Sequence, residues 1–347
     1  ADALAGWVAA QTGQAPPARY DTLAAALDGQ ARSGGTGLQM VAVCTPTGLH
    51  GEVAEQAIAA GLHVVIEKPL EVSMPRARSV AGLAADAARR GQVCSVISQH
   101  RFDPACAAVA GAVAAGRFGR LTSGVADLAW WRPQSYYDSA AWRGTWELDG
   151  GGAVMNQGIH IVDLLLWLFG TPVEVYAHTA RLAHQRVPIE DVAVATVRFD
   201  SGALAVLHAS TAAYPGGAMR LGVHGDRGSA IIHDGRLEYF HAAAAAGPDN
   251  PRDAANQAAA QVPAGELRGA GPAPDGVVLG HLRQYQDVVA AIEDGRSPAV
   301  GTAEGLLALA VVCAVYASAT VGRPVAVAEV LDGGYDAVTV ATEVARR

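Results

Sequence analysis

Lysine is almost absent from this chain: among its 25 Lys and Arg residues only Lys68 is a lysine. Arginine stays charged at physiological pH, whereas a partly buried lysine can shift its pKa and exchange a proton. The use of arginine everywhere else therefore marks Lys68 as a position that needs a primary amine. Chance loss of lysine from an Ala- and Arg-rich chain is the alternative reading.

Other absences limit the class of protein. The four cysteines (Cys44, Cys94, Cys106 and Cys313) lack metal-ligand spacing and predict reduced, buried thiols in a cytoplasmic protein without a metal site. A net charge of −8 without a basic cluster argues against nucleic-acid binding. We find neither a signal peptide nor an apolar run long enough to cross a bilayer, so no membrane partner is expected.

The first 120 residues alternate short apolar strands with amphipathic helices. Strands are predicted over 39–44, 62–66 and 93–97, and helices over 50–61, 74–90 and from Pro104 with Asp103 as N-cap. This alternation predicts a parallel sheet covered on both faces, which binds ligands beyond the carboxyl ends of its strands. Three polar segments, 45–46, 67–69 and 99–101, follow these strands, so we expect them to form one crevice.

The second half follows a different pattern. The Gly-rich residues 149–152 precede a predicted helix over 153–169, and strands are predicted over 192–199, 203–210, 219–224, 230–232 and 237–240. Alternating apolar residues in these strands indicate a largely antiparallel sheet with one covered face. Residues 242–276 are read as a surface insertion, and helices are predicted near 279–294 and 302–321. The fold class is therefore α/β plus α+β.

Asn156 and His160 are four residues apart and are expected on one face of the 153–169 helix. A histidine with a carboxamide one turn earlier suits a general base beside a small substrate. The alternative is a buried structural histidine whose ring is bonded by Asp163. A zinc site is less favoured, because no second His or Cys stands at ligand spacing.

Two motifs together carry a family resemblance. Glu67-Lys68-Pro69 follows a strand, and some ninety residues later comes Gly-Gly-x-x-x-Asn-x-Gly-x-His, over 151–160. With the segments 43–46, 142–144, 225–229 and 322–325, they resemble the glucose–fructose oxidoreductase/inositol dehydrogenase/MocA (Gfo/Idh/MocA) family. The resemblance runs from about residue 20 to the end, apart from 242–276.

The resemblance implies an enzyme that transfers hydride between NAD or NADP and a hydroxyl or keto carbon of a sugar, cyclitol or sugar acid. It assigns catalysis to Lys68, His160 and Asn156, although many family members carry Asp at the last position. The residues implied to line the dinucleotide are Thr45, Pro46, His50, Glu67, Pro69, Gln99, Trp142 and Arg143. Those implied to contact substrate are Arg101, Gln157 and Tyr136. Family members also form homo-oligomers, so a dimer or tetramer is expected.

An arginine fork would suit a carboxylate or phosphate on the substrate. The aromatic residues of 130–133 and 136–137 could stack on a sugar ring, and ordinary core or interface packing is an equal alternative.

A dinucleotide-binding fold should begin with a strand, a G-x-G-x-x-G turn and a second strand, and none precedes Tyr20 in this sequence. Ser33–Gly37 is Gly-rich but precedes a strand, so it is read as a loop. We therefore expect an N-terminally incomplete Rossmann-type domain over 1–120, a substrate and oligomerisation domain over 121–325 and a C-terminal segment over 326–347.

Three explanations remain for the absent front end. The numbered chain omits residues of the native protein, it is a truncated product, or it is a catalytically silent sugar-binding or scaffold relative. The presence of both Lys68 and His160 favours the first.

Overall fold

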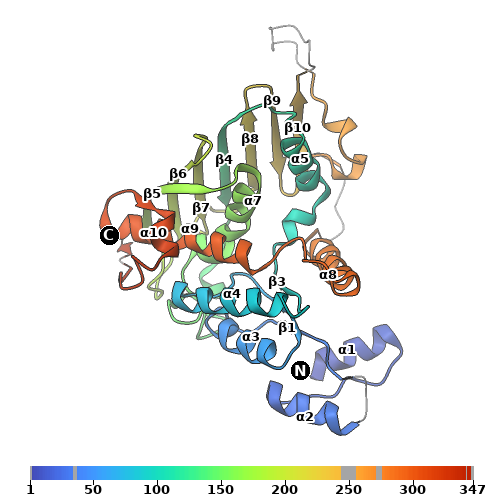
Figure 1. The fold of residues 1–347 in the computed structure, drawn as a ribbon. Coiled ribbons are helices and arrows are strands. Elements are labelled where there is room, and N and C mark those ends of the chain that lie inside the picture. Colours follow the sequence, from blue (N-terminus) through green and yellow to red (C-terminus); the bar gives the residue numbers. More distant parts are fainter. Residues whose placement is uncertain (1, 34–36, 244–254, 271–275, 341, 345–347) are drawn as a thin grey trace.

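The described residues form two β-sheets, one parallel and one mostly antiparallel (Figure 1). The structure is a computed structural model that describes residues 2–33, 37–243, 255–270, 276–340 and 342–344. A parallel sheet has the order β1-β2-β3, and a larger sheet has the order β10-β9-β8-β4-β7-β6-β5-β11 with β12 beside β5. The predicted combination of a parallel sheet with a mostly antiparallel one is confirmed.

The carboxyl ends of the three parallel strands lie at the same edge of their sheet. Its strands are β1 (Met40–Val43), β2 (His63–Ile66) and β3 (Cys94–Val96), and the helices that follow β1 and β2 are α3 (His50–Ala59) and α4 (Met74–Ala88). In the register Val43 pairs with Ile66, and Ile66 pairs with Val96. The polar segments that follow these three residues therefore begin side by side.

A helix from the second half of the chain covers one face of this sheet. Val288 of α8 (Gly276–Asp294) packs with Val65 and Ile97. Gln284 of the same helix accepts a hydrogen bond from the amide of Ser98 at 2.8 Å and donates to the carbonyl of Val96 at 2.8 Å. Packing therefore crosses the predicted boundary at residue 120.

The edge strand β1 departs from two predictions. Ala42 and Cys44 are exposed, because α8 packs over β2 and β3 and does not cover this part of β1. The predicted covering of both faces holds for β2 and β3 and is only partial for β1, where Met40 packs with the α8 cluster while Ala42 is exposed. The predicted burial of all four thiols is wrong for Cys44, whereas Cys94 and Cys106 are buried.

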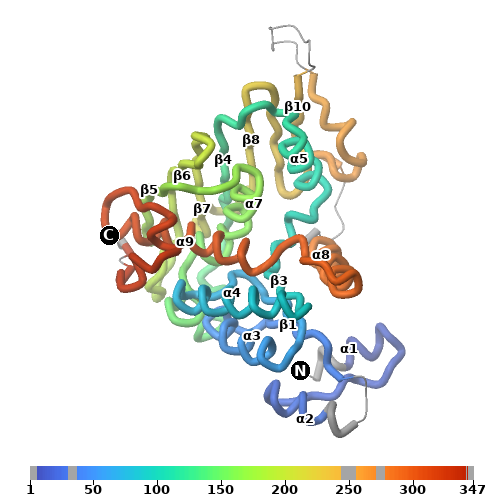
Figure 2. The backbone as a smooth tube through the Cα atoms, viewed as in Figure 1, coloured from blue at the N-terminus to red at the C-terminus, as the bar shows by residue number. Residues whose placement is uncertain are grey.

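Two helices precede the parallel sheet, α1 (Asp2–Thr12) and α2 (Leu23–Ser33). They lie beside β1 and α3 at the N-terminal end of the molecule (Figure 2). Leu23 and Leu27 of α2 pack on the main core. Residues 34–36 of the predicted Gly-rich loop lie outside the described residues.

The large sheet has one buried and one open face. Its strands are β4 (Leu121–Ala129), β5 (Pro172–Arg181), β6 (Val192–Phe199), β7 (Leu204–Ser210), β8 (Met219–Gly225), β9 (Gly228–His233), β10 (Arg236–Ala242), β11 (Val325–Ala326) and β12 (Glu343–Val344). Along β6 buried residues alternate with exposed ones, as predicted. β4 and β5 were not predicted, since polar residues and a glycine interrupt the apolar pattern of β4. β4 runs parallel to β7.

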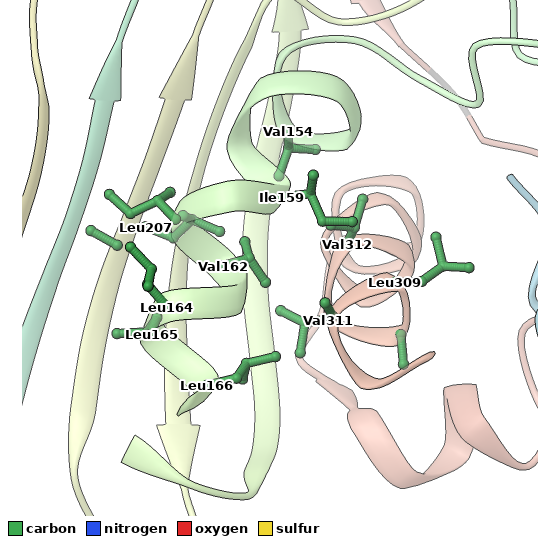
Figure 3. Close-up of a cluster of buried hydrophobic side chains, with 14 of the residues drawn as sticks. Val154, Ile159, Val162, Leu164, Leu165, Leu166, Leu207, Leu309, Val311 and Val312 are labelled. Carbon is green, nitrogen blue, oxygen red and sulfur yellow. The ribbon is translucent and has the colours of Figure 1, made fainter. Parts of the chain in front are cut away.

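Three helices cross the buried face of the large sheet: α5 (Pro104–Ala114), α7 (Ile159–Phe169) and α9 (Thr302–Val321). Figure 3 shows Val162 and Leu166 of α7 facing Val311 of α9, while Leu165 points towards the sheet. These side chains are fully or almost fully buried. Helix α9 also packs on α4 and β3, so it joins the two sheets.

Helix α9 corrects one expectation from the sequence. Its 20 residues, with a hydropathy of 1.8, are long and apolar enough to span a membrane by length and composition, although the sequence analysis found no such run. Its most apolar stretch of 18 residues is 61% buried inside the protein, where the helix packs between the two sheets. Its apolar surface is thus explained by packing.

The described part of the predicted insertion packs on β10. Ala258 and Val262 are buried, and the side-chain oxygen of Asn256 accepts from the amide of Phe240 at 3.1 Å. Most other residues of 255–270 are exposed or half-buried, so this part lies at the surface and is anchored on β10 by a few contacts, while 244–254 and 271–275 lie outside the described residues. The chain ends with α10 (Val327–Leu331) and β12.

Two helical glycines allow a test of the junction between α9 and β3. A Cβ on Gly305 would lie 2.8 Å from Val96 Cγ2, whereas a Cβ on Gly82 of α4 would meet nothing within 4 Å. We expect Gly305→Ala to lower the free energy of unfolding by about 1–3 kcal/mol through overpacking. The matched Gly82→Ala should raise it by about 0.5–1 kcal/mol. Urea unfolding measures both, and equal stabilisation by the two changes would contradict this close packing.

Candidate active site

The ends of the parallel strands, the start of α7 and helix α9 enclose one small cavity. Lys68 follows β2, and its Nζ donates to the backbone carbonyl of Asn156 at 3.1 Å. Lys68 and His160 both line a cavity of about 10 Å³, which has room for roughly one water. The other lining residues are Pro69, Leu70, Val96, Ile97, Ser98, His100, Ile159, Asp163, Gly305 and Ala308. The structure thus brings the two predicted catalytic side chains together.

The glycine run opens into a π-helical turn over Ala153–Gly158, and the regular helix α7 begins only at Ile159. The prediction of one regular helix from residue 153 is therefore wrong at its first turns. Gly152 explains part of this geometry, because a Cβ there would lie 1.7 Å from the carbonyl oxygen of Glu190. Such wide turns are frequent at functional sites.

Glu190 binds the backbone of this turn through its carboxylate, and it was not predicted from the sequence. Its carboxylate accepts hydrogen bonds from the amides of Gly152 and Val154, both at 2.9 Å, and from the hydroxyl of Tyr316 at 3.1 Å. Burial raises the pKa of Glu190 to about 7, against the lowering effect of these donors. Glu190 lies just before β6, and its backbone carbonyl also accepts a hydrogen bond from the amide of Ala153 at 3.2 Å.

Lys68 lies among charges of both signs. Burial lowers the pKa of its amine, the negative charges of Glu67 and Asp149 raise it, and Arg132 and Arg143 lower it again. A lysine in this environment exchanges its proton more readily than an exposed one.

The surroundings of His160 favour its neutral imidazole form. Burial is the main cause that lowers its pKa well below the usual value, and Lys68, His100 and His281 add to this effect. Its ring meets that of His100 edge-on, with the ring centroids 5.2 Å apart. A neutral ring has a nitrogen lone pair that can accept a proton, which is the property that a general base requires.

Asp163 does not bond His160. The alternative prediction, a structural histidine whose ring is bonded by Asp163, therefore names the wrong partner. The two carboxylate oxygens of Asp163 accept from Nε and Nη2 of Arg101 at 2.8 and 2.7 Å. Both side chains are more than nine-tenths buried. The predicted contact of Arg101 with substrate is not supported, because this ion pair uses the fork of the guanidinium.

A buried carboxylate that was not predicted lies beside Asn156. Asp149 is 1% exposed, and its Oδ1 accepts from Asn156 Nδ2 at 2.6 Å while its Oδ2 accepts from the amide of Gly144 at 2.7 Å. Burial raises the pKa of Asp149. Asp149 thus places a carboxylate one hydrogen bond away from the side-chain amide of Asn156. The sequence signal, an acid before three glycines, was read only as the Gly-rich segment that precedes the 153–169 helix.

Two predicted dinucleotide residues have buried polar atoms without a partner. These atoms are Thr45 Oγ1 after β1 and Gln99 Oε1 after β3. Their position beyond parallel strands fits the hydroxyl and amide groups of a nicotinamide nucleoside. The described residues include no G-x-G-x-x-G turn, the element that holds a pyrophosphate. They therefore fit the nicotinamide end of the cofactor.

His50 and Glu67 have protein partners already. The ring nitrogens of His50 lie 2.8 Å from the carbonyl oxygen of Pro69 and 2.9 Å from that of Thr45, and burial lowers the pKa of the ring. Glu67 lies 3.2 Å from His281 of α8. Although burial alone would raise the pKa of Glu67, His281 and Lys68 lower it overall. Both residues thus fix the strand ends by contacts within the protein.

The remaining predicted residues surround the same region. Pro46 caps the short helix Thr47–Leu49, Gln157 is buried in the π-helical turn, and Tyr136, Trp142 and Arg143 lie on the segment between β4 and that turn. In the described part of the chain, no group of three or more His, Cys, Asp or Glu side chains could hold a metal ion.

Because Lys68 is the only lysine, its pKa can be measured directly. In the chain labelled with [ε-¹³C]lysine, we expect the single NMR signal to titrate below the usual value of about 10.4. Asp149→Asn should lower this pKa further, since it removes a negative charge that favours the ammonium form. Glu147→Gln, an exposed change on the same segment, is the matched control and should leave it unaltered. A higher pKa in the folded Asp149→Asn protein would contradict this electrostatic account.

Comparisons with known proteins agree with this geometry. Residues 8–97 match the model described as the oxidoreductase family with an NAD-binding Rossmann fold, and residues 106–231 match the GFO/IDH/MocA C-terminal domain. The WlbA dehydrogenase from Bordetella pertussis, solved with NADH and UDP-GlcNAcA, is 30% identical with a TM-score of 0.76. That match covers 94% of this chain and 87% of the other.

Curated relatives match over shorter stretches. The scyllo-inositol 2-dehydrogenase (NADP(+)) IolW of Bacillus subtilis is 29% identical, over 59% of this chain and 55% of its own length. The 1,5-anhydro-D-fructose reductase of Ensifer adhaerens is 32% identical, over 55% of this chain and 56% of its own length. The chain thus spans little more than half the length of these relatives. From the two family models, the solved relative and the shared motifs, we conclude that this chain belongs to the Gfo/Idh/MocA family of oxidoreductases.

Proposed function

We propose that this protein is an NAD- or NADP-dependent oxidoreductase that transfers hydride between the nicotinamide and a hydroxyl or keto carbon of a sugar, cyclitol or sugar acid. The observation that carries the proposal is the meeting of Lys68, His160 and Asn156 at the ends of parallel strands. The names of the relatives, which include inositol and anhydrofructose enzymes, support this class of substrate.

The chemistry is divided between two side chains. When bound, the nicotinamide supplies the position that accepts or donates hydride. The amine of Lys68 holds the reacting oxygen by a hydrogen bond, and the neutral ring of His160 takes the hydroxyl proton. The backbone carbonyl of Asn156 orients the amine of Lys68 by accepting its hydrogen bond at 3.1 Å. In the reverse direction the same groups return the proton to the keto oxygen.

Two buried pairs position these groups. The bidentate pair of Arg101 and Asp163 fixes the helix that carries His160. Asp149 binds the amide nitrogen of Asn156, which leaves the amide oxygen to accept a hydrogen bond from the substrate. We assign Thr45 and Gln99 to the nicotinamide nucleoside, because each offers a buried atom without a protein partner.

The organisation that fits this function has three parts. A cofactor domain comprises residues 1–120 with α8 packed on its sheet, a substrate domain comprises most of 121–325, and 326–347 form a C-terminal segment. A cytoplasmic location suits a substrate and cofactor of this kind. The catalytically silent alternative is not favoured, since a scaffold would not need Lys68 and His160 together at one cavity.

We further propose that the protein is a homo-oligomer. The open face of the large sheet exposes large apolar side chains from four strands, namely Val125, Tyr176, Val194, Leu204 and Val206. An apolar face of this kind is typical of a surface that is covered in solution. Sedimentation velocity tests this, and a monomer at micromolar concentration would contradict it.

Hydride transfer tests the proposed function directly. Reduction of NAD⁺ or NADP⁺ is followed with scyllo-inositol, myo-inositol, D-glucose and D-glucuronate, and oxidation of the reduced cofactors with 1,5-anhydro-D-fructose. We expect Lys68→Ala and His160→Asn each to lower kcat/KM by at least about 10²-fold, the usual effect of losing an acid–base group.

The control for His160→Asn is Arg89→Gln, which changes an exposed side chain at the end of α4, away from the open sheet face. Its kcat/KM should equal that of the parent chain. Unimpaired turnover by the Lys68→Ala protein would remove that residue from the mechanism. Cofactor affinity that stays within about threefold in both site variants would place the loss in the chemical step.

A further inference from the structure

Two arginines near Lys68 have no acidic partner. Arg132 follows β4 and Arg143 lies before the glycine run, and the Nε atom of each is buried without a hydrogen-bond acceptor. Within the described residues, no carboxylate is bonded to or ion-paired with either guanidinium. Because buried polar groups nearly always have a partner, these two orphaned donors indicate a ligand.

Aromatic rings hold both guanidiniums in place. The guanidinium carbon of Arg132 lies 5.5 Å from the ring centroid of Trp130 and 5.2 Å from that of Tyr136. Arg143 lies 4.4 Å from the same Tyr136 ring and 4.5 Å from the ring of Trp142. Stacking fixes the plane of a guanidinium and leaves the N–H groups at its edge free to bind a carboxylate or phosphate.

Neighbouring carboxylates are used elsewhere. Asp138 pairs with Arg186 at 2.7 Å, and Asp191 binds His184 at 2.9 Å. Asp149 acts electrostatically on Arg143, but its oxygens accept from Gly144 and Asn156. In the described part of the chain, no direct ion pair therefore neutralises the guanidinium of Arg132 or Arg143 beside the site.

Both arginines are also close enough to Lys68 to act on its charge. After burial, which lowers the pKa of Lys68 most, Arg132 and Arg143 lower it further. An anion bound to them would offset this effect and favour the ammonium form of Lys68 once substrate is present. The position of the pair thus connects ligand charge with the proposed reaction.

We propose that Arg132 and Arg143 form an anion subsite that binds a carboxylate or phosphate group carried by the carbohydrate substrate. This inference rests on the proposed function and narrows its substrates from sugars and cyclitols in general to those that bear a negative charge. It gives Arg143 a substrate role in place of the dinucleotide contact implied by family resemblance.

Binding measurements without cofactor test the subsite. The probes are D-glucuronate, D-glucose 6-phosphate and D-glucose, and the signal is tryptophan fluorescence, because Trp130 and Trp142 lie against the arginines. We expect at least one anionic sugar to bind about tenfold or more tightly than glucose. Arg132→Gln and Arg143→Gln should each remove about tenfold or more of this affinity. The two anionic sugars distinguish a carboxylate from a phosphate as the ligand group.

Arg186→Gln is the matched control, because it removes an exposed arginine whose partner Asp138 lies on the same segment. It should leave all affinities within about twofold of the parent chain, and circular dichroism should show that every variant is folded. Equal binding of glucose and both anionic sugars, or no binding of either anionic sugar, would overturn the proposal. So would variants that lose NADH affinity alone, since the arginines would then serve the dinucleotide phosphates.

Failure of the anion subsite can be distinguished from failure of the proposed function. A chain that transfers no hydride, but whose affinity for an anionic sugar still falls in both arginine variants, would retain the subsite and lose the enzyme assignment. A chain that reduces the cofactor with neutral sugars, and is unaffected by either substitution, would keep the enzyme assignment and lose the subsite.

Discussion

The hydrogen bond from Lys68 Nζ to the carbonyl of Asn156 joins the two halves of the molecule at the site. Lys68 stands at the end of a parallel strand, and Asn156 stands in the turn that begins α7 on the large sheet. The distance of 3.1 Å between them depends on how the two sheets are held together. Helix α9 does this by packing on β5 and α7 on one side and on α4 and β3 on the other.

The region around this contact is rich in charges that protein groups only partly balance. Asp149 and Glu67 favour the ammonium form of Lys68, while burial and two arginines favour the free amine. The neutral ring of His160 lies beside the same cavity. Groups with pKa values moved in this way are typical of sites that exchange protons with a ligand.

Local sequence signals predicted much of the fold. The apolar runs at 39–44, 62–66 and 93–97 became β1, β2 and β3, because short apolar runs bounded by Gly and Pro fit buried parallel strands. The alternation in β6 likewise predicted a half-buried strand. β4 escaped prediction because Gly124 and Asp127 break its pattern, although the sheet pairs it on both sides. The packing of α8 on the first sheet depends on contacts between residues far apart in sequence.

The sequence pointed to three residues that the structure brings together, but not to the groups that hold them in place. A single lysine after a strand and an Asn-x-x-x-His spacing led to Lys68, Asn156 and His160. Asp149 and Glu190 could not be assigned, because their roles depend on which amides the folded chain brings to their carboxylates. Arg101 was assigned to substrate because sequence alone does not show its pairing with Asp163. Local pattern thus finds reactive groups, while their partners follow from the tertiary structure.

We propose that the strand ends beside Lys68 receive a nicotinamide nucleotide. Titration of the 347-residue chain with NADH and with NADPH, followed by tryptophan fluorescence, tests it most directly. We predict that NADH, NADPH or both quench the tryptophan fluorescence saturably, by energy transfer to the nicotinamide. The reason is that Trp130 and Trp142 lie against the two arginines that act on the charge of Lys68. The absence of any saturable change in a chain shown to be folded would contradict the account.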